Sequence, residues 1–225
     1  MSERSHVNPE DAGGSRKDRR VATRERILDA ADRVVRAQGV IAATTKRIAA
    51  EAGLAEGSLY NHFPDKARLL IHLVLERMPG IRQVFARLEA DVERRSLEEC
   101  LTTALTEMIA FYSEALPILG GISADPNLLR LCRISFVESG GPQRAHEKLA
   151  AILANEQARG RMKPDTDPQV LAFLLISSCT EYATLARLLG PSPMGLTAEA
   201  HVNKVIAALR PLLSKPDDPV STLSV

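Results

Sequence analysis

The stretch TTKRIAAEAGLAEGSLYNHFPDK, residues 44–66, predicts two short helices joined by a tight turn. Thr44 is a favoured N-cap for the first helix, and Gly53 suits the position just past its end. The second helix must stop before Pro64, because the residue preceding a proline is pushed away from helical geometry. Asp65 can then cap a further helix. Helices this short need neighbours to be stable, so the pair is expected to be braced as a helix-turn-helix.

The runs TRERILDAADRVVRAQG and TTKRIAAEAGLAEGSLYNHFPDKARLL resemble the DNA-binding domain of the TetR (tetracycline-repressor-like) family of bacterial transcriptional regulators. The resemblance covers residues 20–80, and beyond them only the layout of the helices is similar. It implies an all-α fold, with an N-terminal three-helix helix-turn-helix head joined by a linking helix to a helical ligand-binding and dimerisation domain. It also implies a homodimer that binds a palindromic DNA operator as a repressor and is released by a small-molecule ligand.

The composition agrees with a soluble helical protein. Apolar residues make up 45% of the chain and aromatic residues only 4%, with no Trp, which favours helices packed on helices. The longest apolar run, residues 170–176, is far too short for a membrane span, and the polar N-terminus does not resemble a signal peptide. We therefore expect a cytoplasmic protein. Three cysteines without metal-site spacing are expected to be small buried hydrophobes: Cys100, Cys132 and Cys179.

The net charge of +1 is unevenly distributed along the chain. Residues 16–78 contain 13 Lys and Arg against 8 Asp and Glu, whereas residues 79–225 contain 15 against 17. The basic part is the part that carries the helix-turn-helix, as nucleic-acid binding requires. A basic excess can also be no more than a solvated surface.

The positions of Gly and Pro, together with what the resemblance implies, predict four segments. They are a disordered basic arm at 1–20, the TetR-type DNA-binding domain at 21–80, the ligand-binding and dimerisation domain at 81–214 and a disordered tail at 215–225. The arm could touch the minor groove or phosphates, or could serve only as a solubilising tail. We expect the first helix to span about residues 23–38, and a later helix to end near residue 115, before Pro117.

The family motif implies which head residues contact DNA. Phosphate contacts are expected from Thr44, Thr45, Tyr60 and Lys66. The groove-facing set comprises Lys46, Arg47, Glu56, Gly57, Ser58, Asn61 and His62. Ordinary surface roles are the alternative for these residues. One departure stands out, because Ala55 occupies the position where the family usually carries a Ser or Thr cap, which is worth ~1 kcal/mol.

The second domain gives weaker signals. Large or adaptable side chains on the middle helices are candidates for the ligand pocket, together with one acidic residue: Met108, Phe111, Tyr112, Phe136, Phe173, Cys179, Glu181 and Tyr182. Each could instead be core, and Glu181 could bind a cationic ligand or pair with Arg130 or Arg133. The last two long helices are apolar on more than one face, which suggests that they pack on their own domain and on something else. The resemblance implies dimerisation through them, and the alternative is the core of a monomer.

Two other classes of protein compete with this interpretation. An enzyme is disfavoured, because the chain has no nucleophile elbow, no phosphate-binding glycine loop and no zinc motif, and its five histidines do not cluster. We also expect no cofactor. The second competitor is a ligand-binding or adaptor relative that acts as an activator or without operator binding.

Overall fold

The computed structural model describes residues 15–77, 80–139 and 143–213. Within these ranges the regular structure is helical, and no strand occurs. The α-helices are α1 Arg16–Ala42, α2 Thr45–Glu51, α3 Glu56–Tyr60, α4 Lys66–Arg77, α5 Ile81–Asp91, α6 Leu97–Ser123, α7 Pro126–Ser139, α8 Gln143–Ala158, α9 Pro168–Leu189 and α10 Ala198–Leu213. The predicted all-α fold is confirmed. The predicted tail at 215–225 and residues 1–14 of the predicted arm lie outside the described residues.

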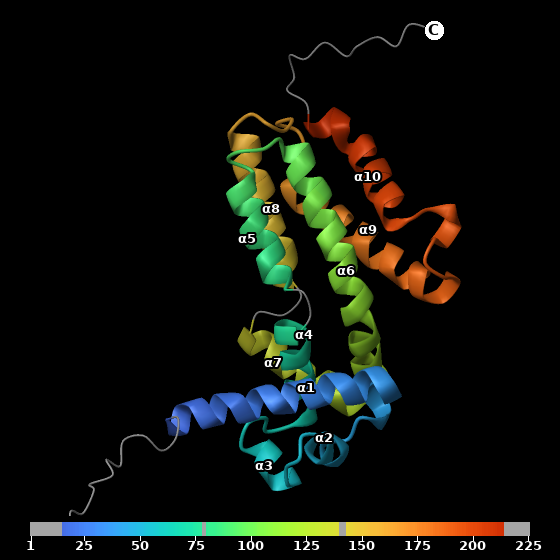
Figure 1. Ribbon diagram of the computed structural model, residues 1–225. Coiled ribbons are helices and arrows are strands. Elements are labelled where there is room, and N and C mark those ends of the chain that lie inside the picture. The colour runs from blue at the N-terminus through green and yellow to red at the C-terminus, as the bar shows by residue number, and fades with distance from the viewer. Residues whose placement is uncertain (1–14, 78–79, 140–142, 214–225) are drawn as a thin grey trace, which may run out of the picture.

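Helices α1 to α4 form a head at one end of the molecule, with α2 and α3 on the outer side of α1 (Figure 1). The predicted caps are present: the Thr44 hydroxyl accepts from the Arg47 backbone N–H at 3.2 Å, and the Asp65 carboxylate accepts from the Arg68 N–H at 2.7 Å. Gly53 has a φ of 67°, which permits the turn between α2 and α3. The two short helices and the turn between them are therefore as predicted.

The first helix begins earlier than we predicted. It starts at Arg16 rather than near residue 23, so residues 16–20 of the predicted disordered arm are helical and exposed. The side chain of Ser15 caps it by accepting from the Lys17 N–H, and Asp18 in the first turn suits the positive end of the helix dipole. At the other end Gly39 interrupts the helix as predicted, with a φ of 78°.

Helix α6 corrects a second prediction, because it continues to Ser123 through the proline expected to end it. Pro117 cannot donate a hydrogen bond to the preceding turn, a loss that costs ~3 kcal/mol in an exposed helix interior. Burial offsets this cost. Ile118 and Ile122, on the turns that follow, are 3% and 2% exposed and pack in the core of the head.

The contact between α6 and the head depends on a glycine. A Cβ at Gly121 would lie 2.5 Å from the Cβ of Val40, which follows the Gly39 break in α1. At the neighbouring Gly120 a Cβ would meet nothing within 4 Å. Gly121 thus lets α6 approach the head more closely than any other residue would allow.

Two clusters of buried side chains hold the molecule together. The first combines α1 to α4 with the C-terminal part of α6, through Phe111, Ile118 and Ile122, and with Leu128 and Cys132 of α7. The second lies among α5, the N-terminal part of α6, α8, α9 and α10, which form the body seen in Figure 1. The chain passes from α4 to α5 near residue 80, where we expected a domain boundary, but α6 belongs to both clusters.

Helix α9 has a buried face against α6 and α8 and an exposed apolar face. The exposed apolar residues are Val170, Phe173, Leu174, Leu188 and Leu189. Among the described residues α9 is the one helix long and apolar enough, by length and composition alone, to cross a membrane. Core helices of soluble proteins pass the same test, and α9 supplies Leu175, Ile176 and Cys179 to the body core.

All three cysteines are buried and free, as the sequence predicted. Burial raises the pKa of Cys179 to about 12 and that of Cys132 to about 11, which keeps both thiols protonated and unreactive at neutral pH.

Candidate DNA-binding surface and ligand cavity

The outer surface of the head carries a small hydrogen-bonded group centred on Glu56. The Thr45 hydroxyl donates to the Glu56 carboxylate at 2.7 Å, and the Tyr60 hydroxyl lies 3.2 Å from Thr45 and 3.5 Å from Glu56. Tyr60 is 46% exposed. Two of the expected phosphate contacts are thus adjacent in space, although they come from different helices, and a carboxylate holds both hydroxyls in place.

The start of α3 confirms the missing cap. Ala55 has the extended backbone of an N-cap but makes no side-chain hydrogen bond, and Glu56 is the acidic residue of the first turn. Gly57 follows on the exposed surface, and a Cβ there would meet nothing within 4 Å. Packing inside the protein therefore does not require a glycine at position 57.

The other residues expected to face the DNA groove differ in whether their side chains are available to contact DNA. Lys46 and Asn61 are exposed, and Ser58 is partly buried on α3. Arg47 is exposed but folds back, donating to Gln38 at 2.8 Å and to the Ala42 carbonyl at 3.1 Å. Its guanidinium would have to leave these partners to contact DNA.

His62 and Lys66 are partly buried in the head, and the buried Nδ1 of His62 has no hydrogen-bond partner among the described residues. Burial lowers the pKa of His62, and the nearby cations Arg20 and Arg24 of α1 lower it further. The ammonium of Lys66 donates to the Val40 carbonyl at 2.7 Å, across 26 residues of sequence. Burial lowers the Lys66 pKa, although Asp125 at the start of α7 opposes this effect. Lys66 therefore ties α4 to the segment that packs on Gly121, a role that the sequence did not predict.

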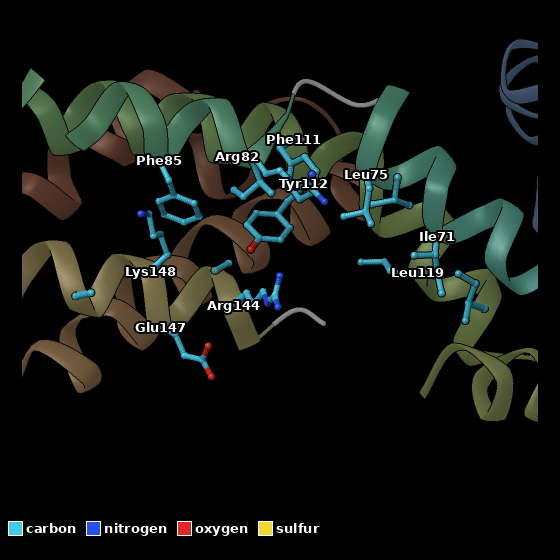
Figure 2. Close-up of a pocket in the computed structure, with 15 residues that line it drawn as sticks. Ile71, Leu75, Arg82, Phe85, Phe111, Tyr112, Leu119, Arg144, Glu147 and Lys148 are labelled. Atoms are coloured by element: carbon cyan, nitrogen blue, oxygen red, sulfur yellow. The ribbon is translucent and has the colours of Figure 1, made fainter. Parts of the chain in front are cut away.

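A cavity of about 620 Å³ lies between α4, α5, α6 and α8. This size lies within the range of pockets that bind small molecules. Figure 2 shows the side chains around it. The lining residues are Ile71, Val74, Leu75, Ile81, Arg82, Phe85, Phe111, Tyr112, Leu119, Ile122, Arg144, Ala145, Glu147, Lys148 and Ala151.

Only two of the eight predicted pocket residues, Phe111 and Tyr112, line this cavity. Met108, Cys179 and Tyr182 are buried in the body core instead. The Tyr182 hydroxyl donates to the carbonyls of Pro191 and Leu196, so its polar atom is already satisfied.

Of the other three predicted pocket residues, two lie away from the cavity and one has a side chain outside the described residues. Phe173 is 59% exposed on α9, where its ring centroid lies 5.7 Å from that of His146. Glu181 is also exposed on α9, so neither residue lines the cavity. The side chain of Phe136 lies outside the described residues.

The walls supplied by α4, α5 and α8 were not predicted from the sequence. On α8, Arg144, Ala145, Lys148 and Ala151 recur at helical spacing and share one face, a pattern that could have been found in the sequence. Nothing in the sequence showed that this face borders a space rather than core. No group of three or more His, Cys, Asp or Glu among the described residues is arranged to hold a metal ion.

Comparison with known proteins supports the assignment of the head. Residues 27–73 match the model of the bacterial regulatory proteins, tetR family. An HTH-type transcriptional regulator of Staphylococcus aureus (strain bovine RF122 / ET3-1) is 28% identical over 55% of this chain and 65% of its own length. The fatty acid metabolism regulator protein of Bacillus subtilis (strain 168) is 29% identical over 50% of this chain and 52% of its own length. The chain thus spans between half and two thirds of these two relatives.

The whole fold also has counterparts among solved structures. A putative TetR-family transcriptional regulator from Mesorhizobium loti superimposes with a TM-score of 0.67, covering 87% of this chain and 99% of the other, at 22% sequence identity. The similarity therefore extends beyond the head to the arrangement of the body helices. The head, over residues 27–73, thus matches the DNA-binding domain of the tetR family of bacterial regulatory proteins, and the whole chain shares the fold of a TetR-family structure.

Proposed function

We propose that this protein is a cytoplasmic transcriptional repressor that binds a palindromic DNA operator as a homodimer and leaves it when a small molecule enters the cavity. One observation carries the proposal: α4 and α6 are each part of both the cavity wall and the core of the DNA-binding head. A ligand that changes the spacing of these helices would change the position of the head.

The exposed face of α9 supports the dimer. Phe173 and Leu174 are 59% and 57% exposed, and Leu188 and Leu189 at the other end of the helix are 72% and 67% exposed. An apolar face of this kind on a soluble protein marks a contact with another molecule. Dimerisation through α9 and α10 would cover it and would present two heads to one palindrome, whose half-sites lie about 34–36 Å apart.

Coupling between the two sites would run through the head–body joint. Ile71, Val74 and Leu75 line the cavity from α4, and the first residue of that helix, Lys66, holds the Val40 carbonyl at 2.7 Å. Val40 in turn contacts Gly121 on α6. A displacement of α4 by a ligand would therefore reach the start of the helix-turn-helix, and the ligand would shift the equilibrium only by its preference for one head spacing.

Selection of genomic fragments tests the proposal. The purified full-length protein is mixed with fragments of the source genome at near-physiological salt, and the retained DNA is sequenced. We expect one or a few palindromic sites. Asn61→Ala in the head should lose these sites, and Asn155→Ala, exposed on α8, should keep them. Retention of DNA without a common site, or equal retention by both variants, would contradict operator recognition by α3.

A second function has one observation in its favour. Glu56 places a carboxylate among the hydroxyls expected to contact phosphates, and Ala55 leaves α3 without a side-chain cap. Both features weaken DNA binding, as expected of a ligand-binding or adaptor relative that does not use an operator. Retention that is no stronger at 50 mM than at 200 mM salt would favour this alternative, because binding to phosphates must weaken steeply over that range.

A further inference from the structure

The cavity has an apolar end and a polar end. Ile71, Leu75 and Leu119, from α4 and α6, lie together toward the head (Figure 2). Phe85 of α5 and the basic residues of α5 and α8 lie at the other end, and Tyr112 stands between the two groups. A ligand that fills this space must itself have an apolar part and a polar part.

The polar end is basic. Arg82, Arg144 and Lys148 line it, against one acidic residue, Glu147, whose carboxylate points away from the cavity in Figure 2. Lys148 forms an ion pair with Glu89. Among the described residues neither Arg82 nor Arg144 has a carboxylate within ion-pair distance, so two guanidinium groups remain to meet a ligand.

Tyr112 adds a hydrogen-bond donor at the same end. The ring packs edge-on against Phe111, with centroids 5.1 Å apart, and its hydroxyl extends toward α8 near Arg144 (Figure 2). Burial raises the pKa of Tyr112 to about 12, so the hydroxyl keeps its proton at neutral pH and can donate it to an acceptor. No described residue accepts that proton at hydrogen-bond distance.

On these observations we infer that the ligand is an amphipathic anion, an apolar chain ending in a single carboxylate or phosphate group. The anion lies between Arg82 and Arg144 with the Tyr112 hydroxyl as a further donor. The chain extends toward Leu75 and Leu119. This inference rests on the proposed function, because it takes the cavity as the effector site. A cationic ligand would meet like charges at the polar end, and Glu181, once a candidate for binding it, is on the exposed surface of α9.

The orientation explains how binding would reach the head. The apolar end of the cavity is the end formed by α4 and by the part of α6 that belongs to the head core. The chain of the ligand, rather than its charge, would therefore press on α4, while the charge would hold the ligand in place. The affinity for the ligand would depend on its anionic group, and release of DNA would depend on the length of its apolar chain.

Matched probes test the inference. Binding of decanoate, decyl phosphate, decan-1-ol and decylammonium to the full-length protein is measured by calorimetry, each below the concentration at which it forms micelles. We expect one or both anions to bind about tenfold to hundredfold more tightly than decan-1-ol, the range expected for hydrogen bonds to a charged group. The stronger of the two anions identifies the head group, and decylammonium should bind most weakly.

Two variants locate the contacts. Arg82→Gln combined with Arg144→Gln should remove the preference for the anions and leave decan-1-ol binding unchanged. Arg187→Gln, at an exposed arginine in the last turn of α9, should leave all four affinities unchanged. Leu119→Trp, which fills the apolar end, should weaken every probe.

The outcomes separate this inference from the proposed function. Equal affinity for decan-1-ol and both anions, or tighter binding of decylammonium, would overturn the anionic ligand while leaving the cavity as a binding site. Failure of all four probes to bind a protein that still retains operator DNA would overturn the inference and leave operator binding standing. Anion binding that survives the double arginine substitution would overturn the assigned position of the charge.

Discussion

Replacing Gly121 by alanine should force α6 away from the head. The new Cβ would stand 2.5 Å from the Val40 Cβ, whereas two such carbons are normally about 3.5–4.0 Å apart. The partner atom is joined directly to the backbone, so it cannot turn aside as the end of a flexible side chain could. To remove the clash, α6 and the segment after Gly39 must therefore move apart by roughly 1 Å.

The size of the effect follows from a comparison with Gly120→Ala. Both substitutions remove a glycine from a helix, which stabilises by about 0.5–1 kcal/mol, but at Gly120 a Cβ meets nothing within 4 Å. The difference between the two variants thus isolates the clash, for which overpacking typically costs ~1–3 kcal/mol. At about 2–4 °C per kcal/mol for a chain of this size, Gly121→Ala should melt ~2–12 °C below Gly120→Ala.

The assay is thermal unfolding followed by circular dichroism, with operator affinity measured at a temperature where both variants are folded. Gly121→Ala should also bind operator more weakly than Gly120→Ala, because the displaced joint changes the position of the head. Equal melting temperatures for the two variants would refute the steric argument. A lower melting temperature with unchanged operator affinity would refute the link between this joint and DNA binding.

Three further substitutions test other parts of the structure. Glu56→Gln should tighten non-specific DNA binding about fivefold at low salt, since one charge near phosphates is worth ~1 kcal/mol in water, while Glu199→Gln on α10 should change nothing. Hydrogen bonds from an arginine and a histidine hold the pKa of Glu76 down from 4.5 to about 2, so its stabilisation is complete above pH 4.5 and is lost as pH falls toward 2. Because Glu76 is partly exposed, we expect the loss of stability to be only ~1 kcal/mol. In Glu76→Gln the free energy of unfolding, measured at several pH values across this window, should no longer show this decrease. Leu174→Glu on α9 should give a monomer in light scattering and Ile134→Glu on α7 should not; a dimer in both cases would contradict the interface.

The head was predictable because its boundaries depend on local chemistry. Thr44, Gly53, Pro64 and Asp65 act through their own backbone geometry and hydrogen bonds, so a single sequence was enough to place the two short helices. The early start of α1 was missed because its signal, Ser15 with Asp18 shortly after, lies in a stretch whose basic composition suggested disorder.

Longer-range features were not predictable in the same way. Pro117 is a helix breaker by local rules, and only the burial of Ile118 and Ile122 against the head keeps α6 continuous. The hydrogen bond from the Lys66 ammonium to a carbonyl 26 residues earlier in the chain was likewise not predicted. Both outcomes depend on tertiary neighbours that no window of sequence contains.

The cavity was the hardest feature to predict. Large apolar residues such as Met108 and Tyr182 look the same in sequence whether they fill a core or border a space. The cavity is instead bordered by mixed side chains, including Arg82 and Arg144, that local rules assign to a solvated surface. Its position depends on how far apart α5 and α8 stand, which is a property of the whole body.

The core that α6 shares with the head has a consequence for how this protein can be divided. Phe111, Ile118 and Ile122 lie far along the chain from the helix-turn-helix, yet they complete its hydrophobic interior. A cut near residue 80 would expose that interior to water, so the head cannot fold as an isolated N-terminal domain. An exchange of heads between relatives would therefore have to transfer two separate segments of the gene. One encodes residues 16–77, and the other encodes the end of α6 together with α7.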